Sequence, residues 1–364
     1  MYKPRQAFGF AKATAAFFSL LLISGCSSNP ASSAASGPEP TAVLGAAGST
    51  FIAPLMTKWV GVYQQTHPTV QINYRPIGSG GGIEELRQGY LSFGASDAPL
   101  DDDQLMGMSP VVQVPVSAGP VCVIYNLPHL GAALRLSAKT LSDIYLGNIF
   151  TWQDPAIARD NPGVNLPKGA VIVVHRSDGS GTTNIFTSYL SKVSHDWAWK
   201  SGHGLSVTWP IGLGADGSKG VLAIVKQTPG TIGYLELNYA KENGVPVASI
   251  QNQAGHFIQP TPGSAAAAIA AFSGALEKDV RSPIVDPPAS APDAYPISGL
   301  SFILIPKDRP DSGQQAAVKD FVAFAISAGQ DSADDLSYAR LPDAVQRQGQ
   351  ALLAQLTANG QALK

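Results

Sequence analysis

Cysteine, histidine and charged residues are scarce in this chain of 364 residues. The two cysteines, Cys26 and Cys122, exclude a scaffold stapled by disulfides, a zinc finger and a cysteine-ligated cluster. Six histidines are scattered without a His-Glu-x-x-His pair, so no zinc site is expected. Lys and Arg number 24 against 26 Asp and Glu, and this balance does not indicate a protein that binds nucleic acid.

The chain is instead rich in apolar residues and turn formers. Hydrophobic residues make up 45% of it and charged residues 14%, with 37 glycines and 28 prolines, which is too apolar for a disordered protein. The length favours about two domains, enough for two cores and a cleft between them.

Residues 1–25 predict an export signal, because three basic residues and no acid precede an apolar run at 13–23. The run is too short for a transmembrane helix. Ile23-Ser-Gly-Cys26 resembles a bacterial lipobox, so we expect acylation of Cys26 and a flexible tether over residues 26–41. The alternative is a plain signal peptide with a chance cysteine. Without residues 1–25, 21 Lys and Arg face 26 Asp and Glu, a net charge of −5.

Strand and helix patterns alternate along the rest of the chain. Alternating apolar residues at 70–74 and a continuous apolar run at 171–174 predict strands, and Cys122 lies in another run, where we expect it to be buried. Helices are expected at 54–65, from a cap at Ser137 to Gly147, at 265–271, at 316–328 and at 342–356. This order predicts an α/β fold with mostly parallel strands.

Two apolar segments, 121–125 and 302–305, bracket a middle region with its own strands and helices. They predict two crossings between a first lobe of residues 42–126 plus 296–364 and a second lobe of residues 127–295. The cleft would lie between the lobes.

Three segments rich in Gly, Ser and Thr each precede a predicted helix: 48–51, 78–82 and 178–183. The first N–H groups of a helix have no partner inside it and carry partial positive charge, so such starts suit an oxyanion. The alternative is ordinary helix capping. Arg176 follows the strand at 171–174 and could grip a tetraoxyanion, with Asp178 holding its guanidinium in place, unless the two form a plain loop ion pair.

Asp97, in Gly94-Ala-Ser-Asp-Ala-Pro99, is an unexpected residue for an anion site, since a carboxylate repels an anion. It becomes useful if the ligand carries a proton, because an ionised carboxylate accepts an O–H from protonated phosphate but meets sulfate lone pair to lone pair. The alternative is a turn residue before Ala98-Pro99.

These motifs, in this order, resemble the bacterial periplasmic phosphate-binding proteins, the substrate-binding subunits of phosphate ABC importers. The resemblance runs from about residue 43 to beyond 341 and rests on Gly48-Ser-Thr-Phe51, Gly78-Ser-Gly-Gly-Gly82, Phe93-Gly-Ala-Ser-Asp-Ala-Pro-Leu100, Leu141-Ser-Asp-Ile-Tyr-Leu-Gly147, Arg176-Ser-Asp-Gly-Ser-Gly-Thr182, Trp209-Pro-Ile-Gly-Leu-Gly214 and Ile232-Gly-Tyr234. It implies a two-lobed periplasmic binding protein fold of type II, which closes on phosphate outside the cytoplasm and delivers it to a membrane permease. A monomer without cofactor or catalysis is expected.

The resemblance also implies the phosphate contacts. Thr50 and Phe51 would give backbone and hydroxyl donors with the Ser49 amide nearby, and Ser79 its N–H and hydroxyl. Asp97 would accept the ligand proton and Arg176 would bind with two N–H groups, supported by Asp178. Ser180, Gly181 and Thr182 would crown the third helix. Gly80 and His175 depart from the family pattern, where a serine and an arginine are frequent, and His175 makes the cleft less positive at neutral pH.

Other functions remain open at this point. A secreted phosphatase or esterase would use Ser96 or Ser180 as nucleophile and need a base within reach. A sulfate or molybdate binder is a third interpretation. Gly212-x-Gly214-x-x-Gly217 with Glu236 matches a dinucleotide fingerprint, but Pro210 interrupts the preceding strand, so residues 212–217 are expected to form a loop.

Overall fold

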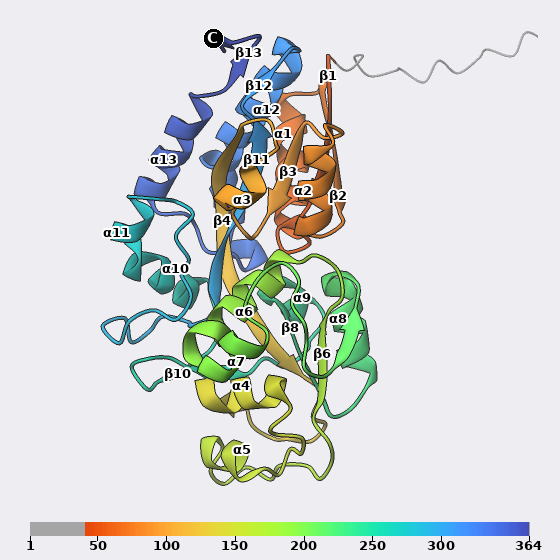
Figure 1. The fold of residues 1–364 in the computed structure, drawn as a ribbon, viewed down its shortest axis with the longest axis vertical. Coiled ribbons are helices and arrows are strands. Elements are labelled where there is room, and N and C mark those ends of the chain that lie inside the picture. Colours follow the sequence, from red (N-terminus) through yellow and green to blue (C-terminus); the bar gives the residue numbers. More distant parts are fainter. Residues whose placement is uncertain (1–40, 364) are drawn as a thin grey trace, which may run out of the picture. The chain divides into compact units, whose positions relative to one another are not determined.

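The computed structural model describes residues 41–363, which hold two lobes joined by two long strands (Figure 1). Residues 1–25 and most of the expected tether, with Cys26, lie outside the described residues. None of the helices in residues 41–363 combines the length and hydrophobicity that crossing a bilayer requires.

Lobe I is built mainly from the two ends of the chain. Its elements are β1 (Ala42–Gly48), α1 (Ala53–Thr66), β2 (Val70–Pro76), α2 (Ser79–Arg87), β3 (Phe93–Ser96), α3 (Asp102–Leu105), the first part of β4 (Val111–Tyr125), β11 (Ser298–Pro306), β12 (Asp308–Arg309), α12 (Ser312–Ala325), α13 (Asp343–Leu353), β13 (Thr357–Ala358) and β14 (Gln361–Ala362).

Lobe II comes from the middle of the chain. Its elements are β5 (Arg135–Leu136), α4 (Ala138–Leu146), α5 (Pro155–Asp160), β6 (Ile172–Arg176), α6 (Gly181–Val193), α7 (His195–Lys200), β7 (Leu213–Ala215), α8 (Gly217–Gln227), β8 (Thr231–Glu236), α9 (Leu237–Glu242), β9 (Ser249–Gln251) and β10 (Phe257–Ile258). The helices α10 (Pro262–Ala271) and α11 (Ser273–Leu276) follow, and α10 packs on β4.

One sheet passes through both lobes in the order β2-β1-β3-β11-β4-β8-β6-β7. The pairs β1–β2, β1–β3, β6–β7 and β6–β8 are parallel, whereas β11–β3, β11–β4 and β4–β8 are antiparallel. The parallel βαβ units of each lobe are therefore as expected, and the sheet becomes mixed where the crossing strands join them.

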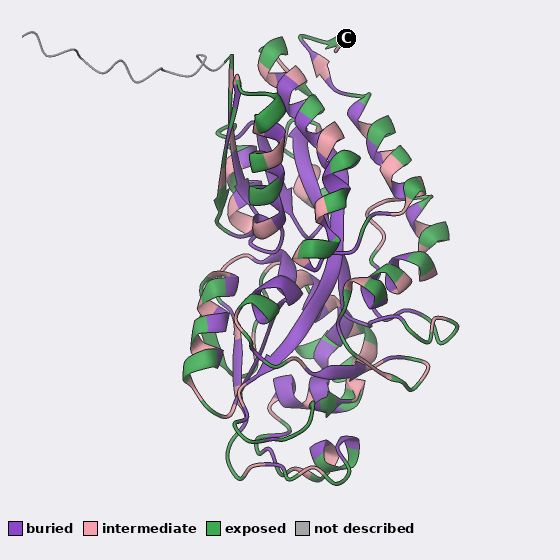
Figure 2. Cartoon of the chain, turned by 180° about the vertical axis from the view of Figure 1, so that it is seen from behind, coloured by how far each residue is buried: buried purple, intermediate pink, exposed green. Residues whose placement is uncertain are grey.

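The crossings are continuous strands. The first part of β4 pairs with β11, and its last residues, Val121–Tyr125, pair with β8 of lobe II. Both strands are buried almost throughout, as Figure 2 shows for the long central strands. The expectation of two lobes and two crossings is confirmed. The exact boundaries of the two lobes stay a prediction. Arg281, which the predicted boundaries assign to lobe II, forms an ion pair with Asp102 of lobe I.

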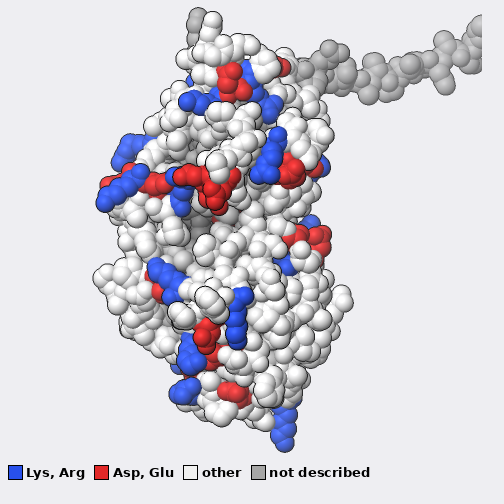
Figure 3. Space-filling model, viewed as in Figure 1, with Lys and Arg blue, Asp and Glu red and all other residues white. Residues whose placement is uncertain are grey.

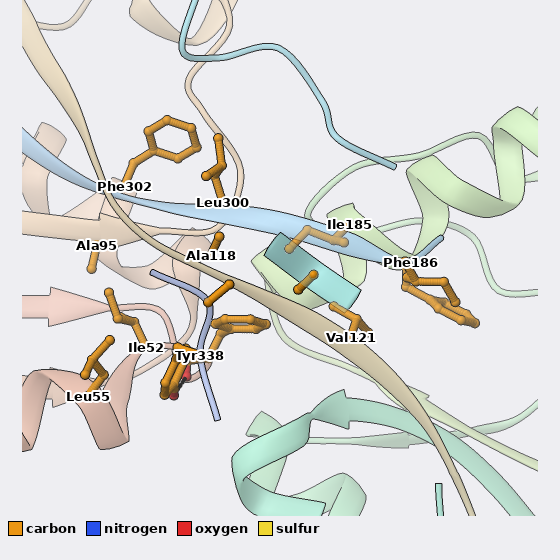
Figure 4. Close-up of a cluster of buried hydrophobic side chains, with 14 of the residues drawn as sticks. Ile52, Leu55, Ala95, Ala118, Val121, Ile185, Phe186, Leu300, Phe302 and Tyr338 are labelled. Carbon is orange, nitrogen blue, oxygen red and sulfur yellow. Dashed lines mark hydrogen bonds between the residues drawn. The ribbon is translucent and has the colours of Figure 1, made fainter. Parts of the chain in front are cut away.

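Side chains from both lobes pack around the crossings (Figure 4). A Cβ on Gly299 of β11 would collide with the side chain of Ile185 from α6, and one on Gly119 of β4 would lie 2.9 Å from the Phe51 ring. Glycine at these positions lets lobe II and the start of α1 approach the crossing strands closely.

The expected helices are present with small shifts at their ends. Ser137 caps α4 by accepting a hydrogen bond from the Thr140 N–H, and α4 ends at Gly147, whose φ of 77° suits glycine. Cys122 is buried and free, as expected. Residues 212–217, expected to be a loop, instead contain β7 and the first residue of α8, so that prediction was wrong. The strand is only three residues long and two of the three are exposed, which left little hydrophobic signal.

Gly48 is the last residue of β1, and its backbone conformation sets the direction of the chain toward the start of α1. Its φ is 140°, and a Cβ there would overlap sterically with the Ala95 carbonyl oxygen on β3. We expect Gly48→Ala to lower the free energy of unfolding by about 3 kcal/mol or more, measured by urea denaturation. Gly89→Ala is the matched control, because Gly89 also has positive φ, 79°, with nothing near its Cβ. That variant should lose only about 1–2 kcal/mol, and equal losses for both variants would refute the steric argument.

Candidate functional site

The predicted site residues lie together where the lobes meet. Thr50, Asp97, Arg176 and Glu236 each stand at or just beyond the carboxyl end of a sheet strand, namely β1, β3, β6 and β8. In an α/β sheet this edge is where ligands bind, because helix N-termini and loops converge there. All four residues are at most 9% exposed.

The helix starts leave several backbone N–H groups without a partner. Within residues 41–363 no protein acceptor lies within hydrogen-bonding distance of the N–H groups of Thr50, Phe51, Ser79 or Thr182. These residues are buried, and a buried N–H without a partner is costly. Four such groups on three helix starts form a donor set for an oxyanion.

Other donors of the predicted set are used inside the protein. The Ser49 N–H donates to the Ala95 carbonyl, 2.9 Å away, and the Ser180 N–H to the Leu205 carbonyl, 2.8 Å away. The Ser180 hydroxyl caps α6 by accepting from the Thr183 N–H. Ser49 and Ser180 therefore act by positioning in this structure, rather than by offering a backbone donor.

Asp97 is surrounded by hydroxyl donors from lobe I. Ser49 Oγ lies 2.6 and 2.7 Å from its two oxygens, and Ser301 Oγ donates to Oδ1 at 2.7 Å. Ser301 stands next to a register irregularity between β11 and β4, where Val116 of β4 is the extra residue. Burial raises the pKa of Asp97 to about 7, although the hydrogen bonds from Ser49 and Ser301 act in the opposite direction.

Arg176 is held by a carboxylate at one edge and by hydroxyls at the other. Its Nε donates to Asp178 Oδ1 at 2.6 Å and its Nη2 to Oδ2 at 2.5 Å, the positioning role that the sequence predicts for Asp178. Burial alone would raise the pKa of Asp178, but the hydrogen bonds and charge of Arg176 outweigh it and hold that pKa below the usual value. The remaining guanidinium edge presents Nη1, which donates to Thr50 Oγ1 at 3.1 Å and to Ser218 Oγ at 3.2 Å. Of the five N–H groups, the second one of Nη2 has no acceptor among the described residues, so a ligand that binds this edge takes the place of the hydroxyls at Nη1.

Glu236 and Ser218 belong to the site and were missed. Glu236 Oε1 accepts from Thr182 Oγ1 at 2.8 Å and from Ser218 Oγ at 2.9 Å, and Ser218 Oγ lies 2.9 Å from Thr50 Oγ1. Ser218 is on α8, so a fourth helix start faces the site. Glu236 was considered only as part of a rejected dinucleotide fingerprint, and Ser218, which follows Gly217 of that fingerprint, was given no role in the site. Glu236 follows the Ile232-Gly-Tyr234 motif by two residues, which was the available signal.

The lobes contact one another directly at the site through small residues. Gly80 N–H donates to the Gly179 carbonyl at 2.8 Å, and Gly181 N–H donates to Ser79 Oγ at 3.1 Å. A Cβ on Gly181 would lie 2.5 Å from Ser79 Oγ and 2.6 Å from Asp97 Oδ2, and one on Gly80 would lie 3.0 Å from the Gly179 Cα. The departure from the family pattern at Gly80 therefore gives the backbone of lobe II room to approach.

The electrostatic attraction of the site is local. Figure 3 shows acidic and basic side chains in small mixed groups, without a large basic field on the face in view.

A cavity of about 550 Å³ between the lobes is lined by Asp97 together with Asn184 and Leu300. His175 stacks on Trp209 with ring centroids 4.6 Å apart, and burial lowers its pKa, so it is neutral at neutral pH.

The catalytic alternatives lack their second group. Ser96 Oγ donates to the Ala98 carbonyl at 2.5 Å, and Ser180 Oγ serves as the helix cap. Among residues 41–363 neither hydroxyl is hydrogen-bonded to a histidine, and no group of three His, Cys, Asp or Glu side chains is placed to hold a metal ion. The described site offers donors and one acceptor, with no nucleophile and base pair.

Comparison with known proteins agrees with this geometry. The family described as PBP superfamily domain matches residues 33–328. The phosphate-binding protein PstS of Xylella fastidiosa strain Temecula1 is 41% identical over 312 residues, covering 85% of each chain, and PstS of Pasteurella multocida is 41% identical over 306 residues, covering 84% of this chain and 88% of its own. In fold, the chain resembles a phosphate-binding protein from Stenotrophomonas maltophilia with a TM-score of 0.63 at 18% identity, covering 85% of this chain and 93% of that one. The chain therefore belongs to the PBP superfamily and, within it, to the PstS family.

Proposed function

We propose that this protein binds one inorganic phosphate ion outside the cytoplasm and delivers it to the permease of an ABC importer. The observation that carries the proposal is the set of buried, unpartnered N–H groups at three helix starts, at the same place as the guanidinium of Arg176 and the acceptor Asp97. The PstS relatives, which match most of the chain, are named phosphate-binding proteins. Enzymatic turnover is not part of this role.

The residues divide into direct donors and supports. The phosphate oxygens accept from the guanidinium edge formed by Nη1 and Nη2 of Arg176 and from four backbone N–H groups, those of Thr50, Phe51, Ser79 and Thr182. Gly181 N–H and the Ser79 hydroxyl, which bond to each other in this structure, turn to the ligand when it enters. Ser49 supports Asp97, Ser180 supports α6, and Asp178 supports Arg176.

Asp97 gives the site its preference for a protonated ligand. Its ionised form accepts an O–H from HPO₄²⁻ or H₂PO₄⁻, whereas sulfate has no proton to donate. The hydroxyls of Ser49 and Ser301 already donate to the Asp97 carboxylate. A sulfate ion beside this carboxylate is therefore repelled by its charge and forms no hydrogen bond with it.

Attachment at the membrane is the part of the proposal that rests on sequence alone. The lipobox-like Cys26 carries the lipid, the residues after it form the tether, and the folded part acts as a monomer on the extracytoplasmic face. Such an arrangement keeps the receptor near its permease while the tether leaves it free to turn.

Replacing Arg176 should remove most phosphate binding. Arg176→Ala deletes two charge-assisted bonds and leaves Asp178 without its cation, so we expect the dissociation constant to rise at least about 100-fold. Isothermal titration with phosphate measures it, and Arg75→Ala, which removes an exposed arginine paired with Glu85, is the control. Wild-type affinity in Arg176→Ala would reject the assigned role.

Asp97→Asn should narrow the gap between phosphate and sulfate. Above about pH 7 wild-type Asp97 is ionised, so its affinity for sulfate should fall about tenfold per pH unit, while below that pH the neutral carboxyl can donate to sulfate. In Asp97→Asn the sulfate affinity should be higher at pH 8 and should lose this slope. Competition titrations at several pH values measure both quantities, and unchanged selectivity would contradict the proton-reading role.

Cys26→Ser should release the protein from the membrane fraction. The thiol is the acylation point, so its loss removes the lipid and leaves the folded part unchanged. Fractionation of cells, with mass spectrometry of the N-terminal peptide, measures both. Retention of the variant in the membrane would disprove lipid attachment at Cys26.

A further inference from the structure

Glu236 draws toward itself hydroxyl protons that an anion in the site would need. Thr182 and Ser218 each donate their single hydroxyl proton to Oε1 of Glu236. Because the proton of Ser218 is used in this way, the hydrogen bond between Ser218 and Thr50 has Thr50 as its donor. Two chains of hydrogen bonds therefore end at Glu236: Thr50 donates to Ser218, which donates to Glu236, and Thr182 donates to Glu236 directly.

This polarity conflicts with binding an oxyanion. While Thr50 donates its proton to Ser218 and Thr182 donates its proton to Glu236, these hydroxyls present only lone pairs to a ligand. Arg176 Nη1 already donates to the Thr50 and Ser218 oxygens, so those oxygens stay acceptors. An anion that uses the hydroxyls must therefore take their protons from Glu236.

The second oxygen of Glu236 is also uncompensated. Oε2 is buried and has no hydrogen-bond partner among the described residues, and the residue is 1% exposed. A buried carboxylate oxygen without a donor is costly and favours the neutral acid. Burial raises the pKa of Glu236, although the charge of Arg176 and the two hydroxyl bonds act in the opposite direction.

The charges around the site make an incoming anion act on Glu236 in the same direction. One cation, Arg176, serves three carboxylates, those of Asp97, Asp178 and Glu236, before any ligand is present. The titratable groups that face Glu236 from the surrounding elements are Arg176 on β6, Asp97 after β3, Cys122 on β4, Tyr239 on α9 and Tyr338 near the C-terminal end. Added negative charge at the site stabilises the neutral form of a carboxyl group.

We propose that Glu236 takes up a proton when phosphate binds and thereby hands the hydroxyl protons of Thr50 and Thr182 to the ligand. The proton comes from solvent and joins Oε2, the oxygen that has no partner. The neutral acid is a weaker acceptor at Oε1, so the hydroxyls turn to the phosphate oxygens. This inference rests on the proposed function and is separate from Asp97, which in its ionised form accepts a proton that the ligand keeps.

Proton uptake distinguishes this role from simple support. Titration of the wild-type protein with inorganic phosphate, in buffers of different ionisation enthalpy at one neutral pH, gives the number of protons taken up per ion bound. We expect Glu236→Gln, which keeps the size and the acceptor of the neutral acid, to reduce that number by most of one proton. Its affinity for phosphate should be equal to or several-fold above the wild-type value at high pH and should depend less on pH.

The matched control is Glu242→Gln, the same substitution at an exposed residue of the neighbouring helix α9, and it should leave the proton count unchanged. If Glu236→Gln does not fold, Ser218→Ala serves instead, because it removes one donor to the carboxylate and makes Glu236 more protonated before the ligand arrives. It should therefore also reduce the uptake. A proton count in Glu236→Gln equal to the wild-type value would overturn the inference while leaving phosphate binding in place. Absence of phosphate binding by the wild-type protein would instead refute the proposed function.

Discussion

Backbone N–H groups that are buried without a protein partner govern the rest of this structure. A fold normally pairs such groups, and here the starts of α1, α2 and α6 leave them open at one point between two lobes. Their partial charges suit an anion without adding side-chain charge. This allows a protein with net charge −2 to bind an anion by local dipoles and one guanidinium, with no long-range attraction.

The polar side chains around these groups are organised by carboxylates. Asp178 fixes one edge of Arg176, Asp97 collects the hydroxyls of Ser49 and Ser301, and Glu236 collects those of Thr182 and Ser218. Each carboxylate decides where protons point, so the site controls which hydrogen-bonding pattern a guest must offer. Under the proposed function, selectivity among tetrahedral anions depends on protons more than on size.

How much the sequence alone predicted depended on distance along the chain. The helix starts, the alternation of strands and helices and the Arg176–Asp178 pair are local patterns, and the structure has them where they were expected. That the starts meet in one place came from the family resemblance. Ser301 contacts Asp97 across 204 residues and Glu236 contacts Thr182 across 54, and no local pattern marks either pair. No signal in the sequence marked Ser218, because α8 begins after a strand of three residues of which two are exposed.

Ser301 also limits how the chain can vary in length. It lies on a strand that crosses between the lobes, where its hydroxyl donates to Asp97 beside the extra residue Val116 of β4. Successive strand residues face opposite sides of a sheet, so inserting or deleting one residue in β11 near this point would rotate the hydroxyl away from the carboxylate and bring its neighbour inward. Length changes at this crossing should therefore be tolerated only in pairs, whereas the surface turns of either lobe are free of that parity.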